Sequence, residues 1–179
     1  MKHLYLIGGT MGVGKTATGQ ALKARLANCA FLDGDWCWDM HPFMVTDETK
    51  RMVMENICFV LSSFLRCSAF DNIVFCWVMH RQEIVDDILS RLDTAECAVH
   101  ALSLVCREDA LVARISRDVA AGRREAGGIG RSVDRLPLYQ ALNTVKLDVS
   151  DITAVEAAGQ IARMSLGDCS TGRGAADGF

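Results

Sequence analysis

The chain has 179 residues, half of them hydrophobic, and a formal net charge of −3. This length and composition suffice for one domain with a substantial core and exclude a disordered chain. The weak negative charge argues against a general nucleic-acid binder, and no apolar run reaches the length that spans a membrane. We therefore expect a protein with neither nucleic acid nor membrane among its partners.

Short apolar runs alternate with segments of helical periodicity along the chain. The expected strands are residues 3–8, 29–35, 72–79, 97–106 and 144–150. The expected helices are residues 16–27, 46–67, 81–92, 107–124, 133–143 and 153–164, and residues 125–132 form a glycine-rich break. This alternation predicts an α/β fold, with a parallel sheet covered by helices on both faces.

The stretch GGTMGVGKTATGQAL, residues 8–22, carries the most specific motif in the chain. It matches G-x-x-x-x-G-K-[ST] between a predicted strand and a predicted helix. Glycines let the backbone curl around an anion, and the helix start adds partial positive charge. Lys15 can reach the outer phosphates and the Thr16 hydroxyl can bind Mg²⁺. The predicted cofactor-binding residues are Gly9, Gly12, Val13, Gly14, Lys15, Thr16 and Ala17.

Two acids, Asp33 and Asp35, follow the second predicted strand with Gly34 between them. Ligands of parallel sheets bind beyond the carboxyl ends of the strands, so both carboxylates can face the phosphate loop. Phosphoryl transfer needs a metal ion and a group that receives the hydroxyl proton of the acceptor. We expect Asp33 to hold Mg²⁺ through water, together with Thr16. We expect Lys15 and Asp35 to be catalytic, with Asp35 orienting and deprotonating the acceptor hydroxyl. A solvated turn is the alternative interpretation of the acids.

Two absences narrow the class of nucleotide-binding protein. The chain has no N-K-x-D motif, so nothing supports guanine selection. The third predicted strand, NIVFCWVM, does not end in the acid that many ATPases carry there. Three aromatic residues, Trp36, Trp38 and Phe43, crowd the two acids instead. They either line an acceptor pocket or cover the local core.

Arginines gather in the fourth predicted helix and after it. Arg114 and Arg117 share a helix face, Arg123 and Arg124 follow, and Arg131 ends the glycine-rich break. Arginines that face the γ-phosphate stabilise its charge, and nearby glycines permit closure over a site. We expect a mobile lid over about residues 114–131, with Arg117 catalytic and Arg114 binding the cofactor. A solvated basic helix is the alternative.

The segments GGTMGVGKT, FLDGDWCWDMHPF and RISRDVAAGRR resemble the small P-loop kinases of metabolites and antibiotics, such as shikimate kinase, gluconate kinase and chloramphenicol phosphotransferase. The resemblance implies a P-loop NTPase three-layer sandwich with a five-stranded parallel sheet ordered 2-3-1-4-5. It also implies ATP with Mg²⁺ and a hydroxyl-bearing small molecule. Gluconate itself is not predicted, because the helix after LDGD lacks the K-M-x-x-G-x-P-L pattern.

The sequence thus predicts an ATP-dependent phosphotransferase that acts on a hydroxyl of a nucleoside, a nucleotide or an antibiotic-like molecule. The alternative is a nucleotide-binding switch or ATPase without a small-molecule acceptor. We expect one kinase domain over residues 1–166, a disordered tail over 167–179, and a monomer or homodimer in the cytoplasm. The eight cysteines contain no C-x-x-C pair, which favours reduced thiols.

Overall fold

The computed structural model describes residues 1–124 and 126–167. Its strands are β1 (Lys2–Gly9), β2 (Cys29–Asp33), β3 (Asn72–Cys76), β4 (Cys97–Val105) and β5 (Val145–Asp148). Its helices are α1 (Lys15–Arg25), α2 (Asp47–Arg66), α3 (Gln82–Ser90), α4 (Glu108–Ala120), α5 (Ile129–Asp134), α6 (Leu136–Gln140) and α7 (Ala154–Gly167). Two 3₁₀ turns complete the order, η1 (Gly34–Trp38) and η2 (Ala126–Gly128).

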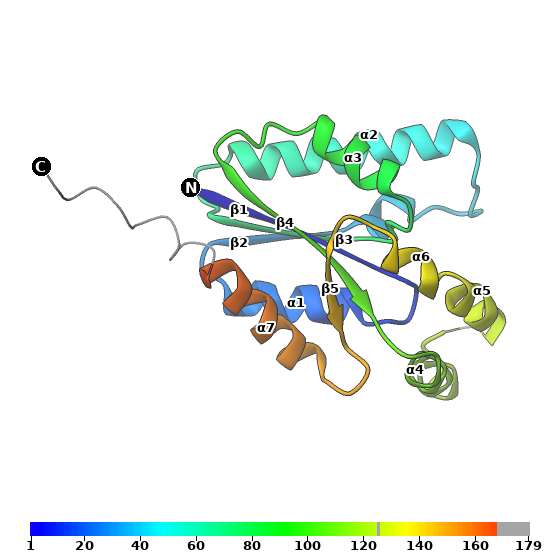
Figure 1. Ribbon diagram of the computed structural model, residues 1–179. Helices are drawn as coiled ribbons and strands as arrows, with labels where there is room; N and C mark the ends of the chain where they lie inside the picture. Colours follow the sequence, from blue (N-terminus) through cyan, green and yellow to red (C-terminus); the bar gives the residue numbers. More distant parts are fainter. Residues whose placement is uncertain (125, 168–179) are drawn as a thin grey trace, which may run out of the picture.

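The five strands form one parallel sheet in the order β2-β3-β1-β4-β5. Helices α1 and α7 cover one face, and α2 and α3 cover the other (Figure 1). The predicted α/β class, the three layers and the strand order are therefore confirmed.

Each face of the sheet has its own hydrophobic core. Val74 belongs to the core on the α1 and α7 side, whereas Ile73 and Phe75 belong to the core under α2 and α3. Successive side chains of a strand point to opposite faces, so a strand covered on both faces must be apolar throughout. This explains the apolar sequence of β3.

The helix α2 starts where the sequence indicates. The Thr46 hydroxyl accepts a hydrogen bond from the Thr49 amide, and the Thr49 side chain accepts one from the Thr46 amide. This capping box satisfies amides that the first helical turn leaves unpaired. Thr46 is therefore the N-cap of α2.

Several predicted boundaries differ from the structure, and three of them bear on the site or on the end of the domain. Strand β3 ends at Cys76 instead of Met79, so Trp77 lies in a loop at the carboxyl end of the sheet. The glycine-rich segment 125–132 is not a simple break, because η2 and the start of α5 lie within it. Helix α7 continues through Gly167, and the remainder of the predicted tail, residues 168–179, lies outside the described residues.

The segment α4 to α6 lies beyond the carboxyl ends of the strands (Figure 1). Two hydrogen bonds join its second half to the loop after β1. Thr10 Oγ1 donates to the Ser132 carbonyl over 2.7 Å, and Tyr139 Oη donates to the Gly9 carbonyl over 2.8 Å. Helices α5 and α6 therefore brace the phosphate loop.

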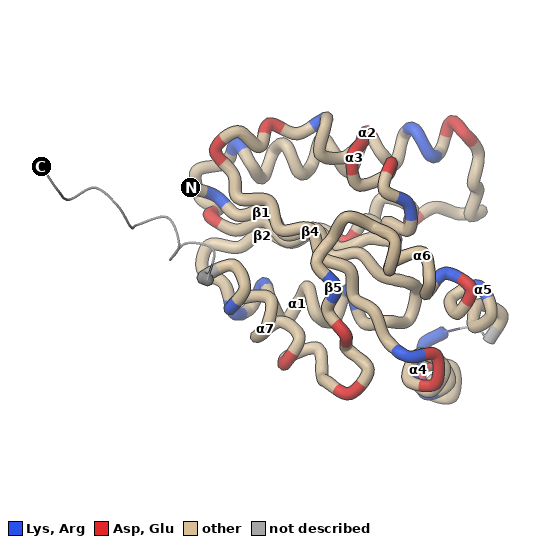
Figure 2. The backbone as a smooth tube through the Cα atoms, viewed as in Figure 1, with Lys and Arg blue, Asp and Glu red and all other residues tan. Residues whose placement is uncertain are grey.

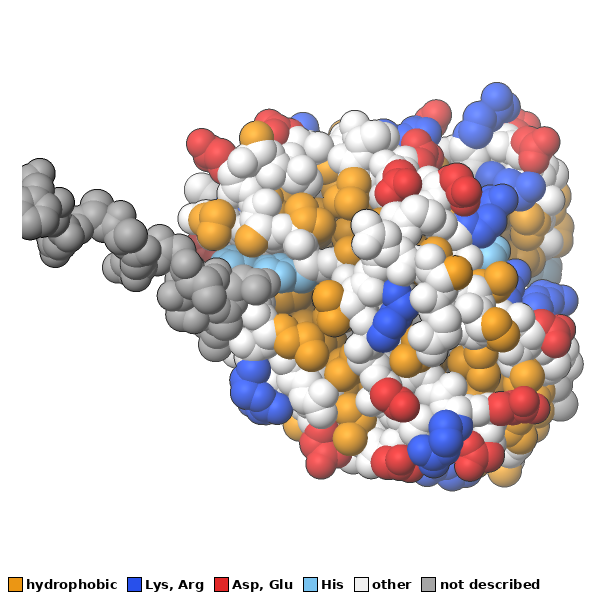
Figure 3. All heavy atoms as spheres, in the orientation of Figure 1, with side chains coloured by type: hydrophobic (Ala, Val, Ile, Leu, Met, Phe, Trp, Pro, Cys, Tyr) orange, Lys and Arg blue, Asp and Glu red, His pale blue; other side chains and the backbone are white. Residues whose placement is uncertain are grey.

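Charged residues of both signs lie interspersed along the backbone in Figure 2, and the face in Figure 3 shows apolar side chains in separate groups between them. No helix within residues 1–124 and 126–167 has the length and apolar character needed to cross a membrane.

Candidate active site

The loop from β1 to α1 has the backbone of an anion cradle. Gly9, Gly12 and Gly14 have positive φ angles of 151°, 87° and 107°, which L side chains rarely adopt. A Cβ at Gly12 would lie 2.5 Å from Ile115 Cγ1 on α4, whereas one at Gly14 would meet nothing within 4 Å. Helix α4 therefore packs against the loop at Gly12, whereas the loop is open at Gly14. This geometry fits the phosphate groups that the motif predicts.

Lys15, the first residue of α1, points into this loop and is buried. Its Nζ donates a hydrogen bond to the Thr10 carbonyl over 3.0 Å. Burial lowers the pKa of the ammonium group, and the negative charge of Asp35 opposes this shift. A buried ammonium group favours anionic partners, so Lys15 is suited to bind phosphate oxygens.

Thr16 and Asp33 are joined by a short hydrogen bond. Thr16 Oγ1 donates to Asp33 Oδ2 over 2.6 Å, and Asp33 Oδ1 accepts a hydrogen bond from the Asp35 amide over 3.1 Å. Asp33 is 5% exposed, so the hydrogen bond from the Asp35 amide fixes a buried carboxylate at the end of β2. A hydroxyl and a carboxylate are oxygen donors that Mg²⁺ prefers, and the pair fits the metal that the motif predicts.

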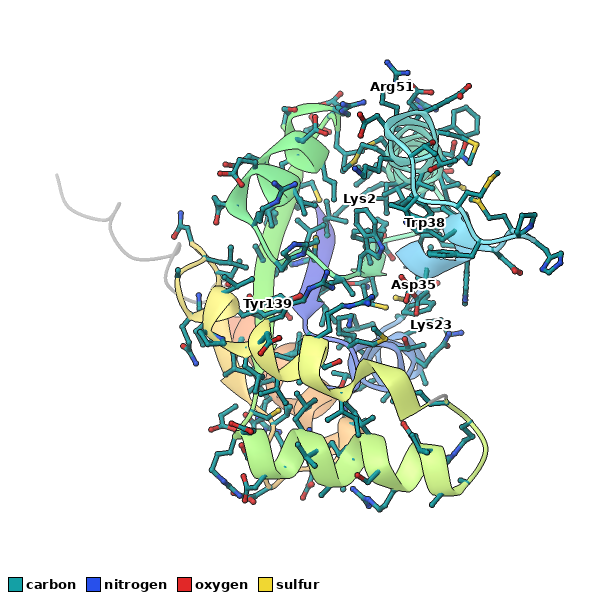
Figure 4. All side chains as sticks on the ribbon, turned by 90° about the vertical axis from the view of Figure 1, so that its right-hand side faces the viewer. Lys2, Lys23, Asp35, Trp38, Arg51 and Tyr139 are labelled. Carbon is teal, nitrogen blue, oxygen red and sulfur yellow. The ribbon has the colours of Figure 1, made fainter. Side chains whose placement is uncertain are left out.

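Asp35 is the second residue of η1, just beyond the end of β2, and is exposed. Figure 4 shows it between Trp38 and Lys23. Although Asp35 is exposed, desolvation by the surrounding protein raises the pKa of its carboxyl, and the charge of Asp33 raises this pKa further. The positive charge of Lys15 lowers this pKa, as do a hydrogen bond from the Trp77 side chain and the charge of Arg124. A carboxyl with a raised pKa beside a lysine is typical of proton-transfer sites.

The aromatic residues near the acids divide between the two faces of the sheet. The Trp38 ring lies 5.8 Å from the Phe43 ring and packs on the core under α2. Trp36 is 57% exposed and lies edge-on to Phe31, 5.5 Å between centroids, on the α1 side. Of the three aromatic residues that crowd the acids in the sequence, Trp38 and Phe43 therefore lie together, and Trp36 lies on the other side.

The arginines of the predicted lid have different surroundings. Arg114 donates to the carbonyls of Val13 at 3.3 Å, Ser150 at 3.3 Å and Ile152 at 3.4 Å, and also to Val149. This guanidinium joins the phosphate loop to the segment after β5. Arg117 is exposed and donates to the Ala113 carbonyl of its own helix over 3.4 Å. Arg124 acts electrostatically on both Lys15 and Asp35.

A cavity of about 710 Å³ opens beside the phosphate loop. It is bounded by Gly12 and Gly14, by α4 and by the segment between β5 and α7. Arg114 and Arg117 line it, but Asp33 and Asp35 do not. The cavity therefore extends from the loop on the side away from the acids.

Sequence reasoning missed three residues of this site. Cys76 and Trp77 were placed inside an apolar strand that was expected to continue to residue 79, although they stand at its carboxyl end. Arg124 was noted in the lid but not selected. The general rule that site residues follow strands was the signal for the first two. The expected roles of all the site residues remain predictions, including those of Ala17, in the exposed first turn of α1, and of Arg117.

A family model described as an AAA domain matches residues 6–129. The chain belongs to this family. No curated protein sequence matches this AAA-domain protein, but its fold is that of the small P-loop kinases, as solved structures show. The tunicamycin resistance protein of Deinococcus radiodurans is 19% identical, with a TM-score of 0.66, over 92% of this chain and 96% of that chain.

Two kinases have a similar fold. A gluconokinase from Sinorhizobium meliloti is 17% identical to this AAA-domain protein, with a TM-score of 0.67, over 96% of this chain and 98% of that chain. Shikimate kinase from Acinetobacter baumannii, in complex with shikimate, is 18% identical, with a TM-score of 0.59, over 94% of both chains.

Proposed function

We propose that this protein is an ATP-dependent phosphotransferase that moves the γ-phosphate of ATP to a hydroxyl of a small molecule. The observation that carries the proposal is the division of labour between two neighbouring acids. Asp33 is buried and bonded to Thr16 over 2.6 Å, whereas Asp35 is accessible and interacts with Lys15. One carboxylate is thus suited to a metal ion and the other to an acceptor.

In this proposal the loop amides and Lys15 hold the phosphates, and Thr16 and Asp33 hold Mg²⁺, which neutralises developing phosphate charge. The nucleoside lies in the cavity beside Arg114 and Arg117. Asp35 receives the acceptor proton at a carboxylate oxygen. Arg124, which already acts on Lys15 and Asp35, stabilises charge on the transferred group.

The acceptor class follows from the face that Trp38 and Phe43 share. The two rings lie 5.8 Å apart on the side of α2, next to the element that carries Asp35. Aromatic rings bind flat or apolar groups, so a nucleoside, a nucleotide or an antibiotic-like alcohol suits this surface. The names of the structurally similar proteins include both polar acceptors and an antibiotic, so they do not select one acceptor class.

The test is a screen of nucleosides, sugars, aromatic acids and antibiotics by thermal shift and ADP release. An acceptor should raise ADP release above the rate with ATP alone. Asp35→Asn should lower that turnover by roughly 10²–10⁴-fold and leave ATP binding intact. Lys15→Ala should weaken ATP binding. Unchanged turnover in either variant would contradict the proposal.

The alternative, a nucleotide-binding switch or ATPase without an acceptor, has one supporting observation. Phe43 is 66% exposed and Phe59, on α2, is 71% exposed. Exposed apolar side chains mark a protein-binding surface where they form a contiguous patch. Slow ATP hydrolysis that no acceptor accelerates, and that Asp35→Asn leaves unchanged, would favour the switch.

A further inference from the structure

The segment after β5 forms one wall of the cavity beside the phosphate loop, and Arg107, the N-cap of α4, holds its acid. Arg107 Nη1 donates to Asp151 Oδ2 over 2.7 Å, and Nη2 donates to Asp151 Oδ1 over 2.9 Å. The Arg107 amide donates to Ser150 Oγ over 2.9 Å. Both carboxylate oxygens of Asp151 are therefore engaged by one guanidinium group at the cavity wall.

Two further acids line this cavity, and each lies beside an arginine. Arg107 Nε donates to Asp109 Oδ1 over 3.3 Å. Arg123 Nη2 lies 3.5 Å from Asp118 Oδ1. Among the described residues that line the cavity, every carboxylate thus has an arginine partner, and only Asp151 has both oxygens bonded to it.

A carboxylate without such a partner would read the base of a nucleotide. Carboxylate oxygens only accept hydrogen bonds. Guanine has neighbouring N–H donors at N1 and N2, which match the two oxygens of a carboxylate, whereas adenine has a donor at N6 beside an acceptor at N1. Asp151 can accept both hydrogen bonds of a guanine edge only by giving up its pair with Arg107.

We propose that Arg107 is a specificity-determining residue of the nucleotide site, because by engaging both oxygens of Asp151 it makes the cavity favour adenine over guanine. This inference rests on the proposed function, which places the nucleoside in this cavity. It adds base selection by an ion pair to a chain that has no N-K-x-D motif.

The experiment measures binding of Mg²⁺–ATP and Mg²⁺–GTP to the full chain by isothermal titration calorimetry. The parental protein should bind ATP more tightly than GTP. In Arg107→Ala the ratio of GTP affinity to ATP affinity should rise by about 5-fold or more, the usual discrimination by two hydrogen bonds to a base edge. The ratio is the readout because a displaced cavity wall would weaken binding of both nucleotides.

A second substitution tests whether Asp151 is the group that reads the base. The double variant Arg107→Ala/Asp151→Asn places an amide donor beside an oxygen acceptor, a pattern that suits adenine. Its preference should therefore return to ATP. Arg107→Lys keeps the charge but lacks the planar fork that engages both oxygens, so its ratio should lie between those of the parental protein and Arg107→Ala.

Arg91→Ala on α3 is the matched control. Arg91 donates to both oxygens of Asp87 over 2.8 and 3.1 Å, and both side chains are similarly exposed, but neither residue lines the cavity. This variant should keep the parental ratio of GTP to ATP affinity. The Arg107 and Asp151 side chains are 53% and 75% exposed, so their pair adds little to the stability of the fold.

The outcomes distinguish this inference from the proposed function. An equal ratio in the parental protein and Arg107→Ala overturns it, even where ATP-dependent transfer to an acceptor is found. Tighter binding of GTP than ATP to the parental protein overturns it, as does a raised ratio that Arg107→Ala/Asp151→Asn retains. A raised ratio that the double variant reverses, without transfer to any acceptor, supports Arg107 and contradicts the kinase. If Arg107→Ala does not fold, a parental ratio in Arg107→Lys overturns the inference and a raised one supports it.

Discussion

The Trp77 ring lies directly against Gly34, so that a Cβ added to Gly34 would be 2.5 Å from Trp77 Cγ. Gly34 begins η1, the turn that carries Asp35, and the Trp77 side chain also hydrogen-bonds to Asp35. Trp77, in the loop after β3, thus supports η1, the turn after β2. Any side chain at residue 34 would push these two segments apart and move Asp35.

We expect Gly34→Ala to lower turnover of the acceptor found in the screen by about 10²-fold, because displacement of a catalytic group by about 1 Å has this effect. Binding of ATP should change little, since the three atoms nearest a Cβ at Gly34 all belong to Trp77 and none to the phosphate loop. Steady-state kinetics and ATP titration measure the two effects. Val145→Ala is the control, because Val145 is 54% exposed and lies on β5, at the edge of the sheet opposite β2. Parental turnover in Gly34→Ala would show that the contact with Trp77 does not position Asp35.

The position of Trp77 illustrates what the sequence cannot determine. The apolar run continues through Met79, and nothing in its composition marks residue 76 as the end of a strand. The strand ends there because β2 turns away at Gly34, and Asp33 paired with Cys76 is the last register pair. A strand boundary set by its neighbour is a tertiary property. By contrast, the phosphate loop was predictable because its functional groups are local in sequence.

The second prediction concerns the pKa of Asp35 in the metal-free and nucleotide-free protein. A carboxyl-carbon NMR titration should give a pKa above the ordinary value for aspartate, because desolvation and Asp33 disfavour the charged form. The carboxylate therefore predominates only at a pH above this raised pKa and becomes protonated as the pH falls through it. A titration at or below the ordinary value would contradict the environment described for Asp35.

Two variants test the causes of this shift in opposite directions. Trp77→Phe removes a hydrogen bond that favours the charged form, so the pKa of Asp35 should rise further. Asp33→Asn removes the neighbouring negative charge, so the pKa should fall. The same sign of change in both variants would be inconsistent with these contacts.

The third prediction compares two arginines of the α4 to α5 segment. Arg124 acts on Lys15 and Asp35, whereas Arg117 is exposed and bonded to a carbonyl of its own helix. Loss of an arginine that stabilises the transferred phosphate costs about 10³-fold or more in turnover. We expect an effect of this order for Arg124→Ala and a smaller one for Arg117→Ala. The reverse order would support the choice of Arg117 that the sequence favoured.

The sequence could not rank these arginines because the chain path after α4 decides their positions. Helical periodicity places Arg114 and Arg117 on one face, and both do line the cavity beside the loop. However, Arg114 bonds to carbonyls of the segment after β5, which is 35 residues further along the chain. Arg124 follows the helix end and lies near enough for its charge to act on Lys15, a proximity that no local pattern encodes.

The last prediction concerns the hydrogen bond of 2.8 Å that Tyr139 Oη donates to the Gly9 carbonyl. Tyr139 is 0% exposed, so Tyr139→Phe leaves this carbonyl without its partner in a dry environment. An unsatisfied buried polar group costs about 1–3 kcal/mol, and in a chain of this size each kcal/mol lowers Tm by about 2–4 °C. Thermal unfolding measures this loss. Leu138→Ala, on the same helix at a residue that is 43% exposed, should change Tm less. Because Gly9 opens the phosphate loop, ATP affinity should also fall in Tyr139→Phe. A parental Tm together with parental ATP affinity would show that α6 does not brace the loop through this bond.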